Sequence, residues 1–327
     1  CFGAAAGALA CVETCSPDDG SAYPAYNETP CDNPNSTCQA TGAIGDPTTG
    51  GVCIPADTFT APSDCPSGTH PMDQGDGTFE ERAATFGITD ASQTVRGATT
   101  LDADGDGDFD LVYGNWRGPH RLWLRDGDAF TLATPSEMES PSKIRTVIAA
   151  DFDNDGYEEI FWNNIGEPNR LFKQTPDGWE SIDMGDALEP DGLGTGAAVL
   201  DLDGDGLLEL FISHGESGSQ PLSLYVTAPN NNHFLRVIPL TQQGGPARGA
   251  VVELQGEDRT QRRLIDAGSG YLCQMEPVAH FGLGQEATPP SLTITWPDGT
   301  TWRGQAPAVD GNLTVSYEGV SIFKPLR

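Results

Sequence analysis

Short apolar runs, each bordered by turn residues, recur three times in the middle of the chain. The runs GATTL, TVIAA and GAAVL each precede an acidic turn, and LVYGN, IFWNN and LFISH each follow it. A proline then introduces a third run at Pro119, Pro168 and Pro221. Such short runs, rich in β-branched and aromatic residues, predict strands rather than helices.

The spacing of these runs is nearly constant along the chain. The acidic turns start at Asp102, Asp151 and Asp201, which are 49 and 50 residues apart. A turn followed by an aromatic residue is expected to open each unit, at Phe79, Phe130 and Trp179. A period of about 40 to 50 residues with four strands per unit is typical of propeller blades. We therefore expect residues 71–228 to form a β-propeller-like array of three four-stranded repeats.

The acidic pattern stops near residue 229, but apolar alternation continues to the end of the chain. The alternating segments include FLRVIPL, AVVELQ, VAHFGLG, SLTITW and NLTVSY. Alternation with period two predicts half-buried strands. Residues 229–327 are thus expected to form a separate, sandwich-like domain, and the whole chain belongs to the all-β class.

The charge of the chain is strongly negative and unevenly distributed. The 327 residues carry a formal net charge of −31, which argues against nucleic acid and anionic bilayers as partners. No apolar run is long enough for a transmembrane helix. Fourteen of the 48 acidic residues fall in three nine-residue windows. Like charges about 4 Å apart repel by on the order of 4 kcal/mol at an effective dielectric near 20, so these windows need a counter-ion.

The windows share the pattern D-x-D-x-D-G-x-x-[DE], which suits calcium. Calcium takes about six to eight oxygen ligands, and alternate residues of a tight turn can point at one centre. In the first loop the expected ligands are Asp102, Asp104, Asp106, the carbonyl of Asp108, and Asp110. The corresponding ligands are Asp151, Asp153, Asp155, the carbonyl of Tyr157 and Glu159 in the second loop, and Asp201, Asp203, Asp205, the carbonyl of Leu207 and Glu209 in the third. Three Ca²⁺ ions would change the net charge from −31 to −25.

Two other metal sites fit the pattern less well. An EF-hand requires a glutamate at position twelve and flanking helices, whereas Tyr113, Trp162 and Ile212 stand there and the flanks predict strands. Magnesium prefers a small octahedral shell that retains water. We therefore expect calcium, in the first place as a structural ion.

Seven of the eight cysteines lie within the first 65 residues, and we expect residues 1–70 to be a disulfide-stabilised segment. The cysteines are Cys1, Cys11, Cys15, Cys31, Cys38, Cys53, Cys65 and Cys273. No CxxC pair or His/Cys spacing predicts zinc, so disulfides and an oxidising, extracellular setting are favoured. The odd number leaves open whether one of the seven pairs with Cys273, pairs with another chain, or stays unpaired. A lipid-modified Cys1 is a further alternative.

Several stretches resemble one family closely. YGNWRGPHRLW, RTVIAADFDNDG, GDALEPDGLGTG and SHGESGSQPLS are similar to the cartilage acidic protein family, as are GSGYLCQMEPVAHFGLG and TITWPDG, which resemble its ASPIC/UnbV domain. The acidic repeats resemble the FG-GAP or VCBS repeats of that family. The resemblance covers about residues 75–318 and implies a secreted, calcium-binding, non-enzymatic protein with a role in matrix or cell-surface interaction. Members of the family carry a longer propeller of about seven blades, and the animal proteins place an EGF-like module after it. This chain instead has three repeats, and its cysteine-rich segment precedes them.

Two classes of function remain. The first is an extracellular, adhesive scaffold without catalytic residues, which binds matrix or cell-surface proteins or glycans, or assembles with itself. Three blades cannot close a propeller, so the C-terminal domain or the N-terminal segment is expected to cap the open strand edges within one chain, or a neighbouring subunit covers them and a fibre grows. The stretch CFGAAAGALACV is either the element inserted between subunits or a buried strand of its own domain. The alternative is a carbohydrate-binding module or a hydrolase with structural calcium. A hydrolase would use His214 or His120, and a sugar could stack on Trp116, Trp123 and Trp162, whose strand positions instead favour packing between repeats. HGES around Ser217 is not a G-x-S-x-G elbow, and we favour the scaffold.

Overall fold

The computed structural model describes residues 80–175, 178–257, 259–266, 268, 271 and 273–326. The chain divides into two compact units, Cys1–Ser67 and Gly68–Arg327, and all of the described residues belong to the second unit. The predicted cysteine-rich segment, residues 1–70, therefore lies outside the described residues.

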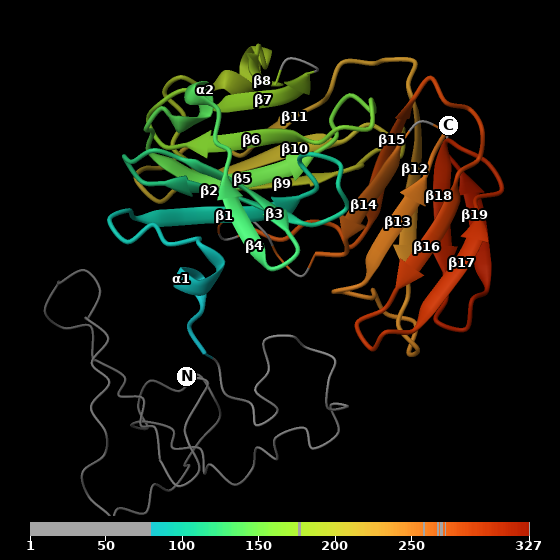
Figure 1. Cartoon of the computed structure of the whole chain (residues 1–327). Helices are drawn as coiled ribbons and strands as arrows, with labels where there is room; N and C mark the ends of the chain where they lie inside the picture. The colour runs from blue at the N-terminus through green and yellow to red at the C-terminus, as the bar shows by residue number, and fades with distance from the viewer. Residues whose placement is uncertain are drawn as a thin grey trace, which may run out of the picture. The chain divides into compact units, whose positions relative to one another are not determined.

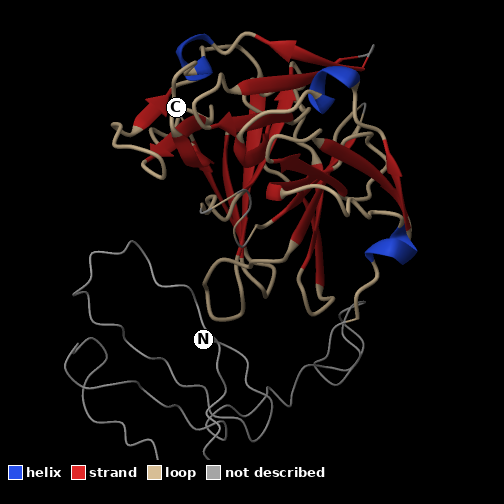
Figure 2. Ribbon diagram, turned by 90° about the vertical axis from the view of Figure 1, so that its left-hand side faces the viewer, coloured by secondary structure: helices blue, strands red, loops and turns tan. Residues whose placement is uncertain are grey.

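The described residues form an all-β structure, as expected (Figure 1). Helical structure among them is limited to α1 (Ala83–Phe86), α2 (Ser136–Glu139) and the 3₁₀ turn η2 (Gly185–Leu188), and Figure 2 shows how the strands dominate. None of these helices has the length and hydropathy that crossing a membrane requires.

The first two repeats are four-stranded antiparallel meanders. The first sheet consists of β1 (Val95–Leu101), β2 (Asp110–Asn115), β3 (Arg121–Asp126) and β4 (Ala129–Leu132), in that order. The second consists of β5 (Ile144–Ala150), β6 (Glu159–Asn164), β7 (Arg170–Thr175) and β8 (Gly178–Ile182). The apolar runs on either side of each acidic turn are the first two strands, so the turn closes a hairpin between them.

The turns that carry an aromatic residue lie at the end of a repeat, whereas they were expected at its start. Phe130 lies in β4 and Trp179 in β8, and both strands pair with the preceding strand of their own sheet. These turns therefore close a sheet rather than open one, because the tight hairpin favours pairing with the adjacent strand. Phe79 lies outside the described residues.

The third repeat departs from the predicted four strands. Its sheet contains β9 (Gly194–Leu200), β10 (Glu209–His214) and β11 (Ser223–Tyr225), in the order β11-β10-β9. Within the described part of the chain no fourth strand joins it. After Tyr225 the segment VTAPNNN runs directly into the C-terminal domain, and its proline and three asparagines do not favour a strand. The described sheets do not close a propeller.

The three repeats share one register and stack through two cores. The strand pairing matches Leu111 with Trp123, Ile160 with Phe172, and Leu210 with Tyr225. One core joins the first two repeats through residues such as Leu122 and Trp162, and a second joins the next pair through Phe161 and Leu210. One face of each of the first two repeats therefore packs against the next repeat.

The C-terminal residues form two four-stranded sheets around a shared core. One sheet has the order β15-β12-β18-β19 and the other β14-β13-β16-β17. Their strands are β12 (His233–Pro239), β13 (Val251–Gln255), β14 (Thr260–Leu264), β15 (Ala279–Gly284), β16 (Ser291–Thr295), β17 (Thr301–Gln305), β18 (Gly311–Val315) and β19 (Ser321–Pro325). The core contains Val252, Phe281, Ile294 and Trp296, as the period-two alternation predicts. The predicted domain boundary at residue 228 falls between β11 and β12.

Three acidic loops as candidate metal centres

Each acidic loop joins the first two strands of its repeat and gathers three carboxylates at one point. The acids at positions one, three and nine of each loop each offer an oxygen, and within each loop these oxygens lie within 4.8 Å of one another. The triplets are Asp102, Asp104 and Asp110; Asp151, Asp153 and Glu159; and Asp201, Asp203 and Glu209. Three oxygens at this separation could share one metal ion.

The acid at position nine is buried and bonded in the same way in each loop. Asp110 is 0%, Glu159 1% and Glu209 3% exposed. One carboxylate oxygen of each acid accepts a hydrogen bond from the backbone N–H at position two of its own loop. The donors are Ala103 for Asp110 (2.6 Å), Phe152 for Glu159 (2.9 Å) and Leu202 for Glu209 (2.6 Å). The first residue of the second strand is thereby fixed to the start of the loop.

Side chains inside each loop hold the turn. The acid at position three accepts from the N–H at position five, over 3.1 to 3.2 Å, in all three loops. The glycine at position six has a positive φ, 93° at Gly107, 94° at Gly156 and 85° at Gly206, which a residue with a Cβ rarely adopts. The repeated Gly in the sequence pattern therefore has a conformational cause.

Some predicted ligands lie outside the triplets. One oxygen of each position-five acid, Asp106, Asp155 and Asp205, accepts from the N–H at position seven over 2.7 to 2.9 Å. The side chain of Asp108 accepts from the N–H of Gly127 over 2.8 Å. The ligand roles of the position-five acids and of the carbonyls of Asp108, Tyr157 and Leu207 stay predictions.

The electrostatics of the loops indicate that a cation would stabilise them. Burial raises the pKa of Asp110 to about 6, of Asp151 to about 7 and of Glu159 to about 9. Burial also raises the pKa of Asp102 and Glu209. Buried carboxylates favour the neutral form when no positive charge compensates them. A hard divalent cation fits an all-oxygen donor set of this kind, as in the first and third loops.

The second loop differs because Lys173 lies in it. The Lys173 ammonium pairs with Asp153, with Asp155 at 2.7 Å and with Glu159 at 3.5 Å. This contact was missed from the sequence, although aligning the three repeats would have revealed a lysine where the other repeats carry Leu124 and Val226.

The C-terminal domain covers the second loop. The N–H of Gly282 in β15 donates to Oδ2 of Asp151 over 3.0 Å, and the N–H of Gly284 donates to the carbonyl of Asn154 over 2.8 Å. Nε2 of His280 lies 2.6 Å from Oδ1 of Asn154. The role of His280 beside the second loop was not predicted from the sequence. These contacts join the second repeat to the C-terminal domain, one of the two segments expected to cap the repeats within one chain.

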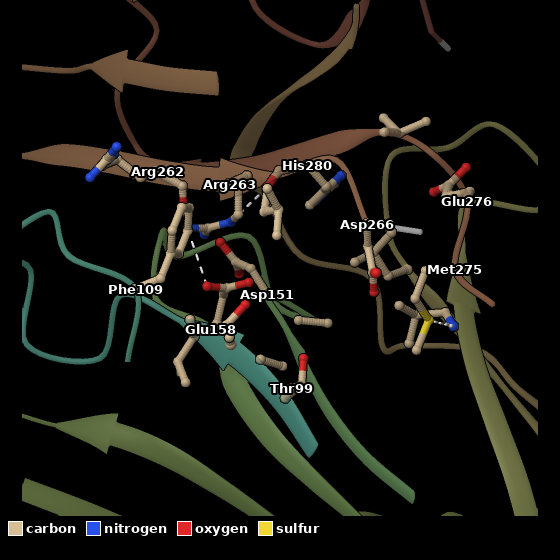
Figure 3. A pocket seen from close by; sticks show the side chains of 18 of the residues that line it. Thr99, Phe109, Asp151, Glu158, Arg262, Arg263, Asp266, Met275, Glu276 and His280 are labelled. Atoms are coloured by element: carbon tan, nitrogen blue, oxygen red, sulfur yellow. Dashed lines mark hydrogen bonds and ion pairs between the residues drawn. The ribbon is translucent and has the colours of Figure 1, made fainter. Parts of the chain in front are cut away.

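A cavity of about 300 Å³ lies beside this contact, between the inner strands of the repeats and β14 and β15 of the C-terminal domain. Arg263 points across it, with its Nη1 3.3 Å from Glu158, and its Nε donates to the carbonyl of His280 over 3.1 Å (Figure 3). Burial raises the pKa of Glu158, and the Arg263 guanidinium opposes that shift. The pair gives the docked surfaces a charged link in addition to the loop contacts.

The two histidines of the enzyme hypothesis make structural hydrogen bonds. His214 has a side chain that is 3% exposed, and its ring nitrogens lie 2.7 Å from the carbonyl of Pro221 and 2.9 Å from Glu189. His120 is 0% exposed and bonds to Asn115 and Ser142. Through these hydrogen bonds, each ring joins the end of a strand to a neighbouring loop.

Two of the three tryptophans proposed to stack on sugars are buried. Trp162 is 0% and Trp123 8% exposed, and both pack between or within repeats. The Arg145 guanidinium lies 4.1 Å from the centroid of the Trp116 ring. Trp162 lies in the core between the first two repeats, as its strand position suggested, and Nε1 of Trp123 donates to the hydroxyl of Tyr113 over 3.1 Å within the first repeat.

Cys273 lies half-buried in the C-terminal domain, and burial raises the pKa of its thiol. The other seven cysteines lie outside the described residues, so the disulfide arrangement stays a prediction.

Two family models match parts of the described sheets. The FG-GAP-like repeat family matches residues 102–162 and 151–212, and the ASPIC and UnbV family matches residues 241–322. The fold and the loops thus define a protein of FG-GAP-like repeats followed by an ASPIC and UnbV domain.

Individual relatives identify the family more closely. The chain is 46% identical to cartilage acidic protein 1 of Xenopus tropicalis over 273 residues, which is 78% of this chain and 42% of that protein. It is 49% identical to cartilage acidic protein 1 of Homo sapiens over 241 residues, 69% of this chain and 36% of that protein. The chain is therefore a homologue of the cartilage acidic proteins, which confirms the family resemblance, and it spans less than half the length of these relatives.

A solved structure of the SapL1 lectin with alpha methyl fucoside aligns with 72% of this chain and 89% of the lectin, at 12% identity and a TM-score of 0.27. A score this low carries no argument about the fold or the ligands of this chain.

Proposed function

We propose that the chain is an extracellular, calcium-binding scaffold protein without catalytic activity. The observation that carries this proposal is the threefold recurrence of a carboxylate triplet with a buried ninth-position acid, always at the turn between the first two strands of a repeat. Calcium at such a turn joins a strand to its neighbour through shared ligands. The ions therefore act on the rigidity of the array rather than on a substrate.

The relatives support the location and the class. They are named as cartilage acidic proteins, and cartilage is largely extracellular matrix. A net charge of −31 suits a protein that is soluble outside the cell and meets cations or basic surfaces. Partners of this kind include matrix proteins, cell-surface proteins or glycans, and copies of the chain itself.

An exposed face of the third repeat supports self-assembly through a second copy of the chain. Leu224 corresponds by register to Leu122, which is 1% exposed because the next repeat covers it. Leu224 itself is 46% exposed, and Leu222 and Val226, which alternate with it on the same face, are 62% and 73% exposed. Contact with another copy would continue the stacking that the first two repeats already use.

Calcium titration of the full chain, combined with negative-stain electron microscopy, tests both parts. We expect tight, saturable calcium binding, a higher melting temperature with calcium, and assemblies that shorten or separate after chelation. Failure of calcium to bind or to raise the melting temperature would contradict the scaffold proposal. Compact monomers in both conditions would contradict self-assembly but leave the calcium scaffold intact.

A further inference from the structure

Lys173 occupies a strand position that is apolar in the other two repeats. The pairs Leu111–Trp123, Ile160–Phe172 and Leu210–Tyr225 are equivalent, so the next position outward is Leu124, Lys173 and Val226. Leu124 packs against the core between the first two repeats, and Val226 is 73% exposed. Only the second of these three positions places a cation beside the acidic loop of its own repeat.

The Lys173 ammonium lies where the acids of the second loop converge. It pairs with Asp153 and Glu159, two members of the carboxylate triplet, and with Asp155 at position five. The lysine side chain is only 21% exposed, and the Glu159 side chain is 2% exposed. One ammonium therefore contacts three of the acids that calcium would need.

The first acid of the second loop is also engaged without a metal. Oδ1 of Asp151 accepts from the N–H of Asp155 over 3.1 Å, and Oδ2 accepts from Gly156 over 2.8 Å and from Gly282 over 3.0 Å. Both oxygens of Asp151 are thus held by backbone donors, one of them from the C-terminal domain.

The first and third loops lack this arrangement. No lysine or arginine forms an ion pair with the acids of the first loop among the described residues. In the third loop Arg236 lies 3.1 Å from Oδ2 of Asp201, but among the described residues no cation pairs with Asp203 or Glu209. Among the described residues, the first and third loops therefore receive no positive charge from a lysine or arginine of their own repeat.

We propose that Lys173 is the resident cation of the second loop, so that the chain binds two calcium ions rather than three. The inference rests on the proposed calcium function for the first and third loops. We call the second loop a lysine-closed loop, because Lys173 of β7 pairs with the acids of the turn between β5 and β6. The same loop contacts β15 of the C-terminal domain through Asp151 and Asn154. It becomes a calcium site only when the lysine is removed.

Counting bound Ca²⁺ on the full chain tests the proposal, by native mass spectrometry together with calorimetric titration. We expect two ions on the natural chain and three on Lys173→Leu, which introduces the residue type of the first repeat. Lys173→Arg should keep two ions, because it preserves the charge. Lys143→Met is the matched control, since Lys143 pairs with Glu167 at 3.0 Å, away from the loops, and should also leave two.

A second set of variants assigns the ions to loops and does not depend on Lys173→Leu folding. Asp104→Asn and Asp203→Asn should each lower the count from two to one, whereas Asp153→Asn should leave it at two. Three ions on the natural chain, or a lost ion in Asp153→Asn, would overturn the lysine-closed loop while leaving the calcium function in place. No bound calcium at all would instead overturn the proposed function and this inference with it.

Discussion

The backbone N–H of Gly282 donates to Oδ2 of Asp151 over 3.0 Å, across 131 positions of the chain. This bond joins the C-terminal domain to the first acid of the second loop. Asp151 is 1% exposed, so the domain completes the burial of the loop as well as its hydrogen bonding. The geometry explains why the second loop is the most enclosed of the three.

Gly282→Ala should weaken this contact. A Cβ at residue 282 would lie 2.2 Å from Oδ2 of Asp151 and 2.4 Å from the backbone of Asn154, so the strand and the loop must separate. We expect a loss of about 1–3 kcal/mol in the free energy of unfolding, measured by urea denaturation in calcium. In Gly245→Ala the new Cβ meets only Oγ1 of Thr241, at 3.7 Å, and this control should change little. Equal stabilities of the two variants would argue against a tight contact at Gly282.

Asp110→Asn should remove the ion of the first loop. Asp110 accepts from Ala103 over 2.6 Å and from Arg125 over 2.8 Å, one oxygen to each N–H, and an amide can satisfy only one of them. We expect one fewer bound calcium and a loss of about 1–3 kcal/mol from the unsatisfied buried donor. Calorimetric titration and thermal melts with and without chelator would measure both.

The matched control for this variant is Asp108→Asn. The side chain of Asp108 accepts from Gly127 and lies outside the carboxylate triplet, so the calcium count should not change. An unchanged count in Asp110→Asn would remove Asp110 from the ligand set.

The parts of the molecule that the sequence predicts are those that local patterns determine. The turn at Asp102 and the strands on either side of it follow from alternation and from a glycine that only a tight turn requires, and both recur at a fixed period. That the described residues place only three strands in the third repeat was not predicted, because the repeat pattern itself implies four and only the segment VTAPNNN departs from it.

Contacts between distant residues could not be predicted in the same way. Nothing near Gly282 in the sequence indicates that it meets Asp151, and His280 lies in an ordinary apolar strand pattern. Lys173 is an intermediate case, since it is isolated in a strand yet stands out once the repeats are aligned by register. The triplets were predicted as acids, but the contact of the second triplet with the C-terminal domain was not.

His120→Asn should reduce the dependence of stability on pH. Burial lowers the pKa of His120 to about 3, while the pKa in the unfolded chain is about 6.5, so the neutral ring is stable in the fold. Stability from this group is present above pH 6.5 and is lost as the pH falls toward 3. Between pH 7 and pH 5 the loss from His120 should be about 2 kcal/mol.

Asparagine is a suitable replacement because Asn169 holds the equivalent position in the second repeat. Its Oδ1 accepts from the N–H of Asn164 over 2.8 Å, as Nδ1 of His120 accepts from the N–H of Asn115 over 3.0 Å. The variant should be less stable at pH 7, since it loses the bond to Ser142, but should lose about 2 kcal/mol less than the natural chain on going to pH 5. Denaturation curves at both pH values, in saturating calcium, give the comparison. Identical pH dependence in the two proteins would mean that His120 does not titrate as described.

Leu224→Asp should abolish self-assembly if the uncovered face of the third repeat joins two copies. A carboxylate at the centre of the apolar row formed with Leu222 and Val226 would have to be desolvated in any such contact. Light scattering after size exclusion should show a concentration-dependent increase in mass for the natural chain and a constant monomer mass for the variant. Ile322→Asp tests the specificity of the effect, because Ile322 is 66% exposed on β19 of the other domain and should leave assembly unchanged. Loss of assembly in Ile322→Asp but not in Leu224→Asp would move the interface to the C-terminal sheet.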